Sequence, residues 1–335
     1  MIDRKHKEEV DYLQVISPNN RMHYHGFDYL RIIFCAIVVA LHTGLITASY
    51  DLGKDFGKII EFGIGYLAVP VFLQLSAYLY VLNSSKGTNR FKERIKYLAS
   101  IYAFWLALNL IIPSGGKISS YFSSFKLILE TLVGNHTVIY FIFELMLITI
   151  LIEGARKFCN TLPKVLGAFI GSLVLMIYGK YLVESFGFGL GYANPFNFIP
   201  YAFSAILLAR LTSPGVPWDT WKKYEVLVLL AALFAGLELF LLRGFIYMAY
   251  GRPSLIFASM LIVMWFQQTN FRPHRLVTVL SGLTLGVYLS HEIIRGFIVN
   301  LISDFGTSPN TLTVFLLTLM LSVLFSHFVK RTSLL

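Results

Sequence analysis

Hydrophobic residues along this chain gather in long runs that short polar segments separate. A helix needs about 20 apolar residues to cross a membrane, and most of these runs approach or exceed that length. The pattern therefore predicts an all-α membrane protein, a polytopic bundle of about ten transmembrane helices. The predicted spans are residues 27–49, 59–82, 91–112, 136–153, 164–184, 195–211, 224–243, 253–268, 279–302 and 310–329.

Two segments fall outside these spans. Residues 1–25 are polar and mixed in charge, which predicts a cytosolic N-terminal tail or an interfacial helix, and residues 26–331 then form a single transmembrane domain. Residues 120–133 are apolar on one face but too short to cross, so we expect a helix at the membrane interface.

Positive charges divide unevenly between the loops on the two sides. If the N-terminus is cytosolic, the inner loops hold nineteen Lys and Arg residues and the outer loops hold six. Cytoplasmic loops carry the excess in most membrane proteins, so both termini are predicted in the cytosol. The same division explains the net charge of +10. No soluble domain exists to gather these cations on one surface, so no nucleic-acid partner is expected.

Composition supports the same class of protein. The chain is 56% hydrophobic and 14% charged, with a mean hydropathy of +0.67. Its two cysteines, Cys35 and Cys159, imply no disulfide framework and have no metal-ligand spacing. We expect a protein of the cell membrane, surrounded by membrane lipids, with no bound metal.

The first predicted helix carries two residues that a lipid anchor does not need, Arg31 and His42. Eleven residues separate them by roughly 16 Å along a helix and return to nearly the same face. Ionisable side chains are costly within a membrane and mark candidate functional sites. Asp28, three residues before Arg31, either orients the guanidinium or favours the start of the helix. Arg31 itself could alternatively extend toward the lipid headgroups.

The motif formed by Asp28, Arg31 and His42 resembles the first-helix signature of the acyltransferase-3 family of integral membrane acyltransferases. Two residues depart from the pattern of the family's second helix, Leu73 where an aromatic is usual and Ala77 where a glycine is usual. The chain stops just after the last predicted span, as expected of the form without a C-terminal hydrolase-like domain. Four further stretches resemble the family in the same order, at residues 65–80, 90–102, 136–148 and 283–294.

The resemblance implies an O-acyltransferase, and most of all an O-acetyltransferase, that modifies a sugar hydroxyl of a cell-surface polysaccharide or its lipid-linked precursor. Acyl-CoA, with acetyl-CoA the first choice, is then a donor substrate, and no cofactor stays bound. His42 is the expected catalytic residue, as a general base or as a transient acyl carrier. Both roles fit an imidazole, which exchanges protons near neutral pH.

Cations at the inner ends of the first and third spans are candidates to hold the coenzyme phosphates. Arg31, Arg90 and Arg94 offer the planar donor groups that suit phosphate oxygens. The flexible arm of the donor would then run through one internal passage from these arginines to His42. Ser76 either bonds near the thioester or bonds back to its own helix.

Other polar residues within the spans have two interpretations each. Glu144 lies deep, so we expect an arginine or histidine partner on another helix. His291, Glu292 and Arg295 form a polar turn that either ties helices together or supports catalysis. Four charges near the outer face either line a cavity for the acceptor or pair locally, namely Lys180, Glu184, Glu238 and Arg243.

One further segment and one rival function remain. Loop 186–197 combines glycines, aromatics and asparagines, which suits a sugar but is also typical of an interfacial loop. A secondary transporter or glycan exporter is the rival function, although the chain has no inverted repeat or matching pair of broken helices. A scaffold without chemistry does not explain the shared face of Arg31 and His42. The acceptor sugar and the oligomeric state are not determined by the sequence.

Overall fold

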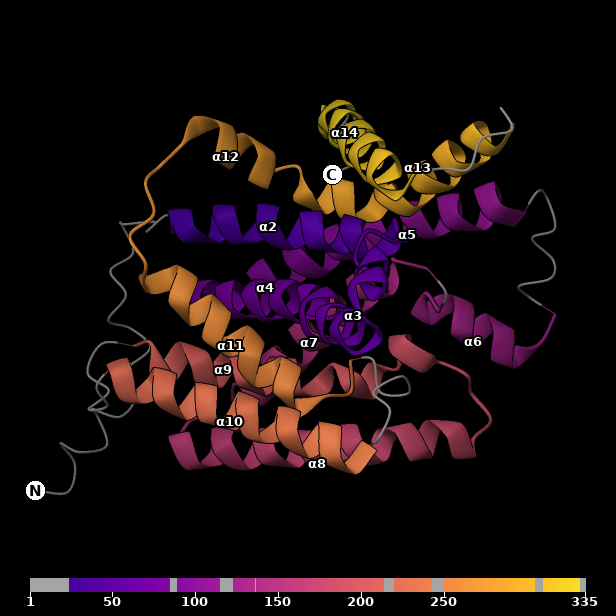
Figure 1. The fold of residues 1–335 in the computed structure, drawn as a ribbon. Coiled ribbons are helices and arrows are strands. Elements are labelled where there is room, and N and C mark those ends of the chain that lie inside the picture. Colours follow the sequence, from indigo (N-terminus) through magenta and orange to yellow (C-terminus); the bar gives the residue numbers. More distant parts are fainter. Residues whose placement is uncertain are drawn as a thin grey trace, which may run out of the picture.

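The structure is a computed structural model that describes residues 24–84, 89–114, 123–135, 137–213, 220–242, 250–304 and 310–331. Every element among these residues is helical (Figure 1). The helices are α2 (His25–His42), α3 (Lys54–Ile59), α4 (Ala68–Ser84), α5 (Asn89–Ser114), α6 (Phe125–Val133), α7 (Tyr140–Ala155), α8 (Leu162–Ser185), α9 (Ile199–Leu211), α10 (Thr220–Leu242), α11 (Pro253–Gln268), α12 (Arg275–Ser281), α13 (Thr284–Asp304) and α14 (Thr311–Lys330).

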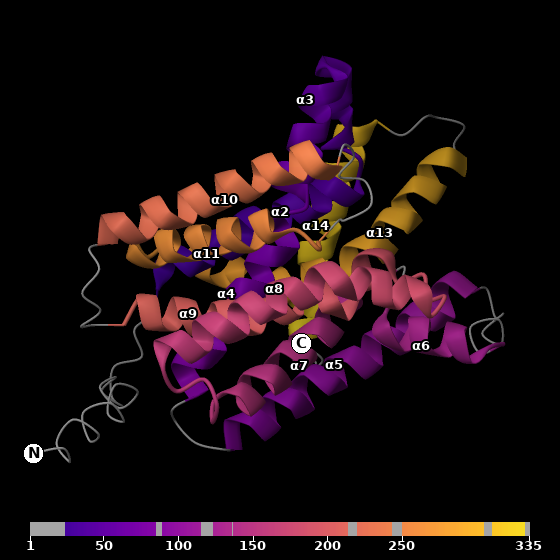
Figure 2. The ribbon, with the colours of Figure 1, turned by 90° about the horizontal axis from the view of Figure 1, so that it is seen from below.

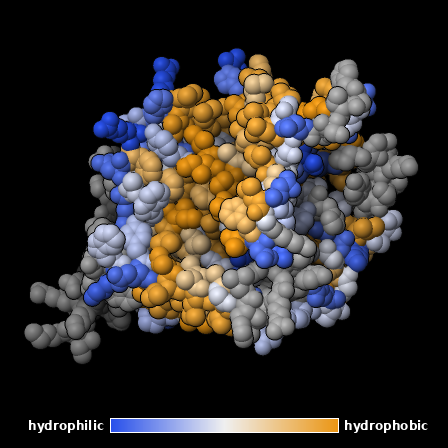
Figure 3. Space-filling model, viewed as in Figure 1, coloured by the Kyte–Doolittle hydropathy of each residue, from blue (hydrophilic) through white to orange (hydrophobic). Residues whose placement is uncertain are grey.

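Six stretches of the described chain are long and apolar enough to cross a membrane. They are His25–His42, Asp55–Asn83, Asn89–Ile112, Leu162–Ser185, Thr284–Asp304 and Thr311–Lys330. In Figure 3 hydrophobic residues form a band over the middle of the visible face, and hydrophilic residues lie mainly toward its margins. The described elements are thus all helical, and the six apolar helices support the membrane class. The count of ten stays a prediction, since α7, α9, α10 and α11 occupy four predicted spans but are not among these six.

Helices α2 and α4 lie inside the bundle, where most of the others pack around them (Figure 1). Helix α2 contacts α4 and α11 on one side and α12, α13 and α14 on the other. Helix α4 also contacts α7 and α9, and α8 and α10 form outer layers (Figures 1 and 2). This arrangement places the residues of α2 and α4 against several helices at once.

Helix α2 ends seven residues earlier than predicted, at His42. The Thr43 hydroxyl donates to the Val39 carbonyl at 2.8 Å, and Gly44 adopts a positive φ of 79° that most residues avoid. A short 3-10 turn, α3 and a π-helical turn follow before α4 begins. His42 therefore lies at the end of its helix and not two-thirds of the way along.

The first and last described helices have their free ends on one side of the bundle. Ser281 donates to Asp28, near the start of α2, at 2.7 Å. The Lys330 ammonium, at the end of α14, donates to the carbonyl of Gly282 at 3.3 Å. An even number of membrane crossings places the two ends of a chain on the same side. The cytosolic location of both ends stays a prediction.

Candidate functional site

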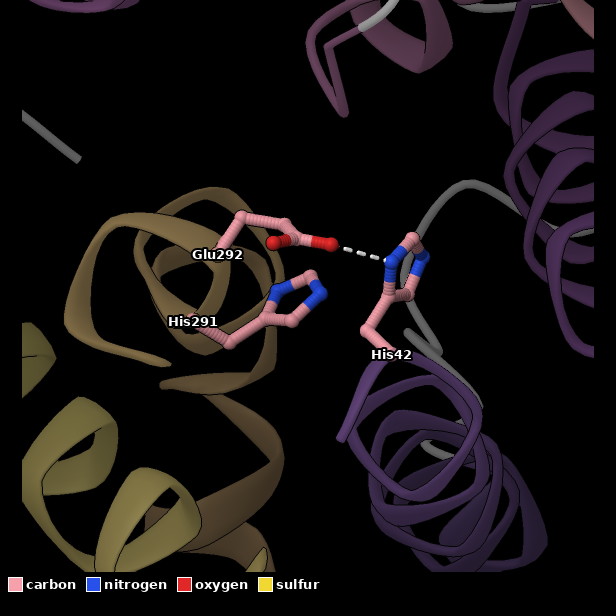
Figure 4. A group of neighbouring side chains, drawn as sticks. All are labelled: His42, His291 and Glu292. Atoms are coloured by element: carbon pink, nitrogen blue, oxygen red, sulfur yellow. Dashed lines mark ion pairs between the residues drawn. The ribbon is translucent and has the colours of Figure 1, made fainter. Parts of the chain in front are cut away.

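His42 meets two residues of α13 across the gap between helices. The three side chains of His42, His291 and Glu292 point toward one another (Figure 4). The Nδ1 atom of His42 contacts Oε1 of Glu292 directly. The second ring nitrogen of His42 lies on the far side of the imidazole from this carboxylate (Figure 4). A carboxylate in this position fixes the ring and holds a proton on Nδ1, so Nε2 is the basic nitrogen.

Glu292 is held from its other side by the same helix. The Nε and Nη2 atoms of Arg295, one turn on, lie 2.9 Å and 2.8 Å from Oε2 of Glu292. One carboxylate therefore bridges a guanidinium and an imidazole. Such a bridge restrains the rotamer of Glu292 and, through it, the orientation of the His42 ring.

His291 lies fully buried beside this pair. Its ring meets that of His42 edge to face, with centroids 4.9 Å apart. Nδ1 of His291 is 2.6 Å from the carbonyl of Tyr288. A carbonyl only accepts, so Nδ1 carries the proton and Nε2 is an acceptor. Within the described part of the chain this Nε2 has no hydrogen-bond partner.

His42, His291 and Glu292 also form a group that could hold a metal ion. Their donor atoms all lie within 4.8 Å of one another. Two imidazoles and a carboxylate are a donor set that Zn²⁺ accepts. An ion between His42 and Glu292 would first have to separate their direct contact, since ligands of one ion stand farther apart. The geometry as it stands is that of a hydrogen-bonded pair.

A cavity of about 1170 Å³ opens beside this group, and His42, Glu292 and Arg295 lie in its wall. Four tyrosines form an aromatic wall, Tyr66, Tyr140, Tyr192 and Tyr250. Burial raises the pKa of the Tyr250 phenol, so it stays neutral and serves as a hydrogen-bonding group. The other lining residues are carboxylates, amides, threonines, aliphatic side chains, one glycine and one phenylalanine, namely Leu41, Glu61, Leu106, Asn109, Leu110, Ile112, Leu127, Glu130, Thr131, Asn135, Thr137, Val138, Ile293, Gly296, Phe297 and Asn300.

The predicted donor residues lie toward the end of the bundle that holds the start of α2, with Ser76 near the middle of α4. Arg94 donates to Ser76 at 2.9 Å and to Thr149 at 3.0 Å, and its guanidinium lies 4.9 Å from the ring centre of Tyr80. The ring of Phe27, near the start of α2, packs edge to face against Tyr78 of α4. The structure thus brings Arg94 and Ser76 together, as the donor hypothesis requires.

Arg31 and Arg90 lie near this end but outside the Arg94 cluster. Arg31 donates to Asp28 at 3.5 Å and to Ser281 at 3.4 Å. This contact matches the predicted ion pair with Asp28. Arg90 donates to the backbone carbonyl of Asn83 at 3.1 Å in an exposed position.

The shared face of α2 is observed. Arg31 meets Ser281, Cys35 meets the carbonyl of Thr284, and His42 meets Glu292, so α2 runs along the α12–α13 segment. The expected passage along this face stays a prediction, although apolar side chains pack there. Cys35, Val39 and Val287 are buried there and pack together between the two ends. Arg31 and Arg94 also lie outside the lining of the cavity that holds His42.

An alternative route is visible on α4. Phe72, Ser76 and Leu79 are partly exposed, while Leu73, Leu75 and other neighbours in this helix are buried. These positions recur every three or four residues, so they form one stripe. Phe72 contacts the rings of Phe141 and Tyr288, and Tyr288 contacts His291. The stripe leads from Arg94 toward the histidines.

Glu144 lacks the partner that the sequence analysis expected. Its side chain is fully buried in α7. Neither carboxyl oxygen bonds to any described residue, so the expectation of an arginine or histidine partner is wrong. Phe143, the residue before Glu144 in α7, contacts the ring of Tyr102.

Two of the four acceptor-side candidates, Glu184 and Glu238, have side chains that the structure describes. Glu184 lines a separate, smaller cavity. Glu238 is buried and binds Arg252 at 3.0 Å, which matches the alternative of local pairing. Lys180 lies in α8 with its side chain outside the described part, and Arg243 lies outside the described residues.

Comparison with known proteins gives one match. A family model described as an acyltransferase domain matches residues 24–329. The match runs from the residue before α2 to the last turn of α14, so both ends of the His42 and Glu292 pair lie within one domain. No curated protein and no solved structure matches the sequence.

Proposed function

This chain belongs to the acyltransferase-3 family, and from that premise we propose that it transfers an acetyl group from cytosolic acetyl-CoA to a sugar hydroxyl. The acceptor is a cell-surface polysaccharide or its lipid-linked precursor, and the protein works in the cell membrane. The observation that carries the proposal is the pairing of His42 with Glu292 in the wall of a large cavity.

His42 acts as the general base in this proposal. Its Nε2 takes the proton of the sugar hydroxyl while the oxygen attacks the thioester carbonyl, and Glu292 stabilises the imidazolium through Nδ1. The C–O bond forms, the C–S bond breaks, and the coenzyme thiolate leaves. The proton on His42 then passes to that thiolate. The products are the sugar ester and free coenzyme A.

The donor binds at the Arg94 end. Arg94 has Ser76 and Thr149 as neutral partners, so its charge is not consumed by a carboxylate in direct contact. A guanidinium of this kind gains most from a phosphate. The pantetheine arm then follows the partly exposed stripe of α4 toward His42, with Phe72 moving aside.

The acceptor occupies the large cavity. Aromatic rings such as Tyr140 and Tyr192 pack against the C–H face of a sugar ring, and their centroids are 5.3 Å apart. Glu61, Asn109 and Asn300 offer acceptors and donors for hydroxyl groups. The cavity beside His42 therefore offers aromatic rings for the C–H face of a sugar and polar side chains for its hydroxyl groups.

Transfer of labelled acetyl groups from acetyl-CoA tests this function. Protein in nanodiscs is incubated with labelled acetyl-CoA and sugar, and both coenzyme A release and sugar esters are measured. The His42→Ala change is expected to lower turnover by about 100-fold or more with little effect on donor binding. The Arg94→Ala change is expected to weaken donor binding by about tenfold, as loss of a charged hydrogen bond does.

Two outcomes contradict the proposal. If His42→Ala retains turnover, His42 is not the general base. Movement of a labelled glycan across liposomes with no thioester cleavage under any condition identifies a transporter instead.

A further inference from the structure

The large cavity has an apolar mouth between α5, α6 and α13, whose ends lie on one side of the bundle (Figure 1). Phe297 is 68% exposed, Ile112 is 52% exposed and Leu127 is 37% exposed, although all three line the cavity. These side chains belong both to the cavity wall and to the outer surface of the protein. The cavity therefore opens onto an apolar surface here. The residues of this mouth are Leu106, Leu110, Ile112, Leu127, Ile293 and Phe297.

The two long helices at the mouth are not close packing partners of each other. Helix α5 packs mainly against α7, and α13 packs mainly against α14 and α2. Both helices belong to stretches that are long and apolar enough to cross a membrane, Asn89–Ile112 and Thr284–Asp304. An exposed apolar side chain on such a span contacts hydrocarbon chains rather than water. The mouth is therefore continuous with the lipid-facing surface of the protein.

Gly296 leaves open space in the wall of α13. Glu292, Gly296 and Asn300 are spaced four residues apart, so they form one row along the helix, and all three line the cavity. A side-chain carbon at Gly296 would meet no atom of another described segment within 4 Å. Glycine within a helix costs roughly 0.5–1 kcal/mol relative to alanine, and no neighbouring backbone requires it here. Its effect is to keep the cavity wide one turn from Glu292.

The cavity thus joins a polar interior to an apolar mouth. The polar groups of its wall include His42, Glu292, Asn109 and Asn300. A ligand that matches both parts carries hydroxyl groups and a hydrocarbon chain. A free polysaccharide has no group that would cover Phe297 and Ile112. A phosphatidylcholine molecule has the chain but no hydroxyl groups for the polar wall.

We propose that the acceptor is a sugar carried on a hydrocarbon chain, which enters from the bilayer between α5 and α13. Its chain lies at the mouth and its sugar lies beside His42. The inference rests on the proposed function, because it assumes that this cavity receives the sugar. It selects the lipid-linked precursor over the finished polysaccharide. Gly296 is then a specificity-determining residue, since its open space lets the chain pass beside Glu292.

A photoreactive acceptor tests where the chain binds. The probe is decyl glucoside with a diazirine at the end of its chain, added to the protein in phosphatidylcholine nanodiscs, and the labelled peptides are identified by mass spectrometry. We expect residues 106–112 and 293–300 to be labelled more strongly than α8, whose apolar residues are largely exposed. A phosphatidylcholine that carries the same diazirine is expected to show no such preference.

A bulky residue in the open space tests the role of Gly296. Gly296→Phe should lower labelling of the mouth by about fivefold or more, because the new ring occupies the path of the chain. Gly171→Phe is the matched control, since a side-chain carbon at Gly171 in α8 also meets no atom within 4 Å and Gly171 lies outside the cavity wall. It should leave labelling unchanged. Leu110→Trp narrows the same mouth from α5 and provides the test if Gly296→Phe fails to fold.

Acetyl transfer gives a second measurement. The acceptors are decyl and methyl glycosides of glucose, galactose, mannose and N-acetylglucosamine. For the sugar that accepts the acetyl group, we expect the decyl glycoside to have a KM at least about tenfold lower than the methyl glycoside, because its chain is buried at the mouth. Gly296→Phe should reduce this ratio, and Gly171→Phe should preserve it.

The two measurements separate this inference from the proposed function. Equal labelling patterns from the glucoside and the phosphatidylcholine would show general contact with lipid and overturn the inference. Labelling that both Gly296→Phe and Leu110→Trp leave unchanged would also overturn it, even if acetyl transfer persists. Labelling of the mouth that depends on Gly296, with no transfer to any sugar, would support the chain site and overturn the proposed chemistry.

Discussion

At the scale of single residues, Glu292 is the partner that gives His42 its chemistry. It contacts Nδ1 of His42 through one oxygen and Arg295 through the other. We expect Glu292→Gln to lower kcat by about 100-fold while KM for acetyl-CoA changes little, because an amide cannot stabilise the imidazolium. Measurement of kcat and KM across pH 5–9 checks this. The exposed Asp304→Asn, on the same helix, is the control.

An unchanged kcat in Glu292→Gln would make the contact structural and leave His42 without a partner in catalysis. A change in KM with an unchanged kcat would point to a role of Glu292 in substrate binding. Both results would return the polar turn of α13 to its alternative role of tying helices together.

The same group of side chains makes a prediction about metals. The direct contact between His42 and Glu292 leaves no space for an ion between these two atoms. Acetyl transfer is therefore expected to be unchanged after dialysis against a strong chelator. Metal content measured by mass spectrometry before and after dialysis gives the control. Loss of activity that returns with Zn²⁺ would identify the three residues as ligands.

Glu144 makes a prediction about stability. Its two oxygens are buried without a partner among the described residues. Such a group typically costs roughly 1–3 kcal/mol. Glu144→Leu is therefore expected to raise the midpoint of thermal unfolding by about 2 °C or more. Thermal unfolding in detergent measures this midpoint, and Glu93→Leu, at an exposed position, is the control. A lower midpoint would mean that Glu144 binds a group from solvent.

Sequence reasoning found the residues that are unusual for a membrane but not their partners. Arg31 and His42 stand out because charges are costly in apolar surroundings, and Arg94 stands out because a guanidinium at the inner end of a span could hold phosphate. Their contacts with Ser281, Glu292 and Ser76 join separate helices, and no local pattern records such pairs. The polar turn at His291 and Glu292 was the only sign of the site's second half.

At the scale of elements, apolar runs located the helices but missed their interruptions. The first run was predicted to continue to residue 49, whereas α2 stops at His42. The run at 279–302 breaks after Ser281 into α12 and α13. Interruptions of this kind depend on hydrogen bonds such as that of Thr43 to Val39, which hydropathy does not encode. The first of these interruptions places His42 at a helix end beside a cavity.

One buried ion pair holds the segment that follows Tyr250, a residue in the wall of the large cavity. Glu238 accepts from Arg252 at 3.0 Å and from the Ser254 amide at 2.9 Å, and both charged side chains are 6% exposed. We expect Glu238→Gln to lower the free energy of unfolding by about 3 kcal/mol, because it removes the carboxylate that balances the charge of the buried Arg252 guanidinium. Chemical unfolding followed by intrinsic fluorescence measures the loss.

A matched pair gives the control for this prediction. Glu153 and Arg156 form an ion pair at 3.3 Å whose side chains are 29% and 32% exposed. Glu153→Gln should cost less than about 1 kcal/mol, as partly exposed pairs do. Replacement of both Glu238 and Arg252 by Met should recover part of the loss. Equal effects at the two pairs would refute the role assigned to burial.

At the scale of the whole molecule, the candidate donor and acceptor regions are separate. Arg94 meets Ser76 near the middle of α4, whereas His42 and its cavity lie at the end of α2. Their separation along α2 follows from helix geometry and was predictable, at roughly 16 Å between Arg31 and His42. The packing between the two regions was not predictable from the sequence, because it depends on which faces of α2, α4 and α13 meet. Cys35, Val39 and Val287 close one face, while the stripe of α4 remains partly exposed.

The two-ended arrangement makes a prediction about sidedness that labelling can test. The distribution of Lys and Arg predicts that the Arg94 end faces the cytosol, which is where acetyl-CoA is made available. Lys92 is exposed near Arg94, and Asp51 is exposed beyond the end of α2 that carries His42. In a parent with the buried Cys35 and Cys159 replaced by Ala, cysteine at position 92 should react with an impermeant maleimide only after the cells are opened.

Cysteine at position 51 in the same parent should react in intact cells, because the cavity opens to the other side of the membrane. The parent must retain acetyl transfer, which shows that the two alanines preserve the fold. Labelling of position 92 in intact cells, with position 51 protected, would show that the protein has the opposite orientation in the membrane. A donor made in the cytosol would then arrive at the wrong end of the bundle, and the assignment of donor to Arg94 and acceptor to the His42 cavity would have to be exchanged.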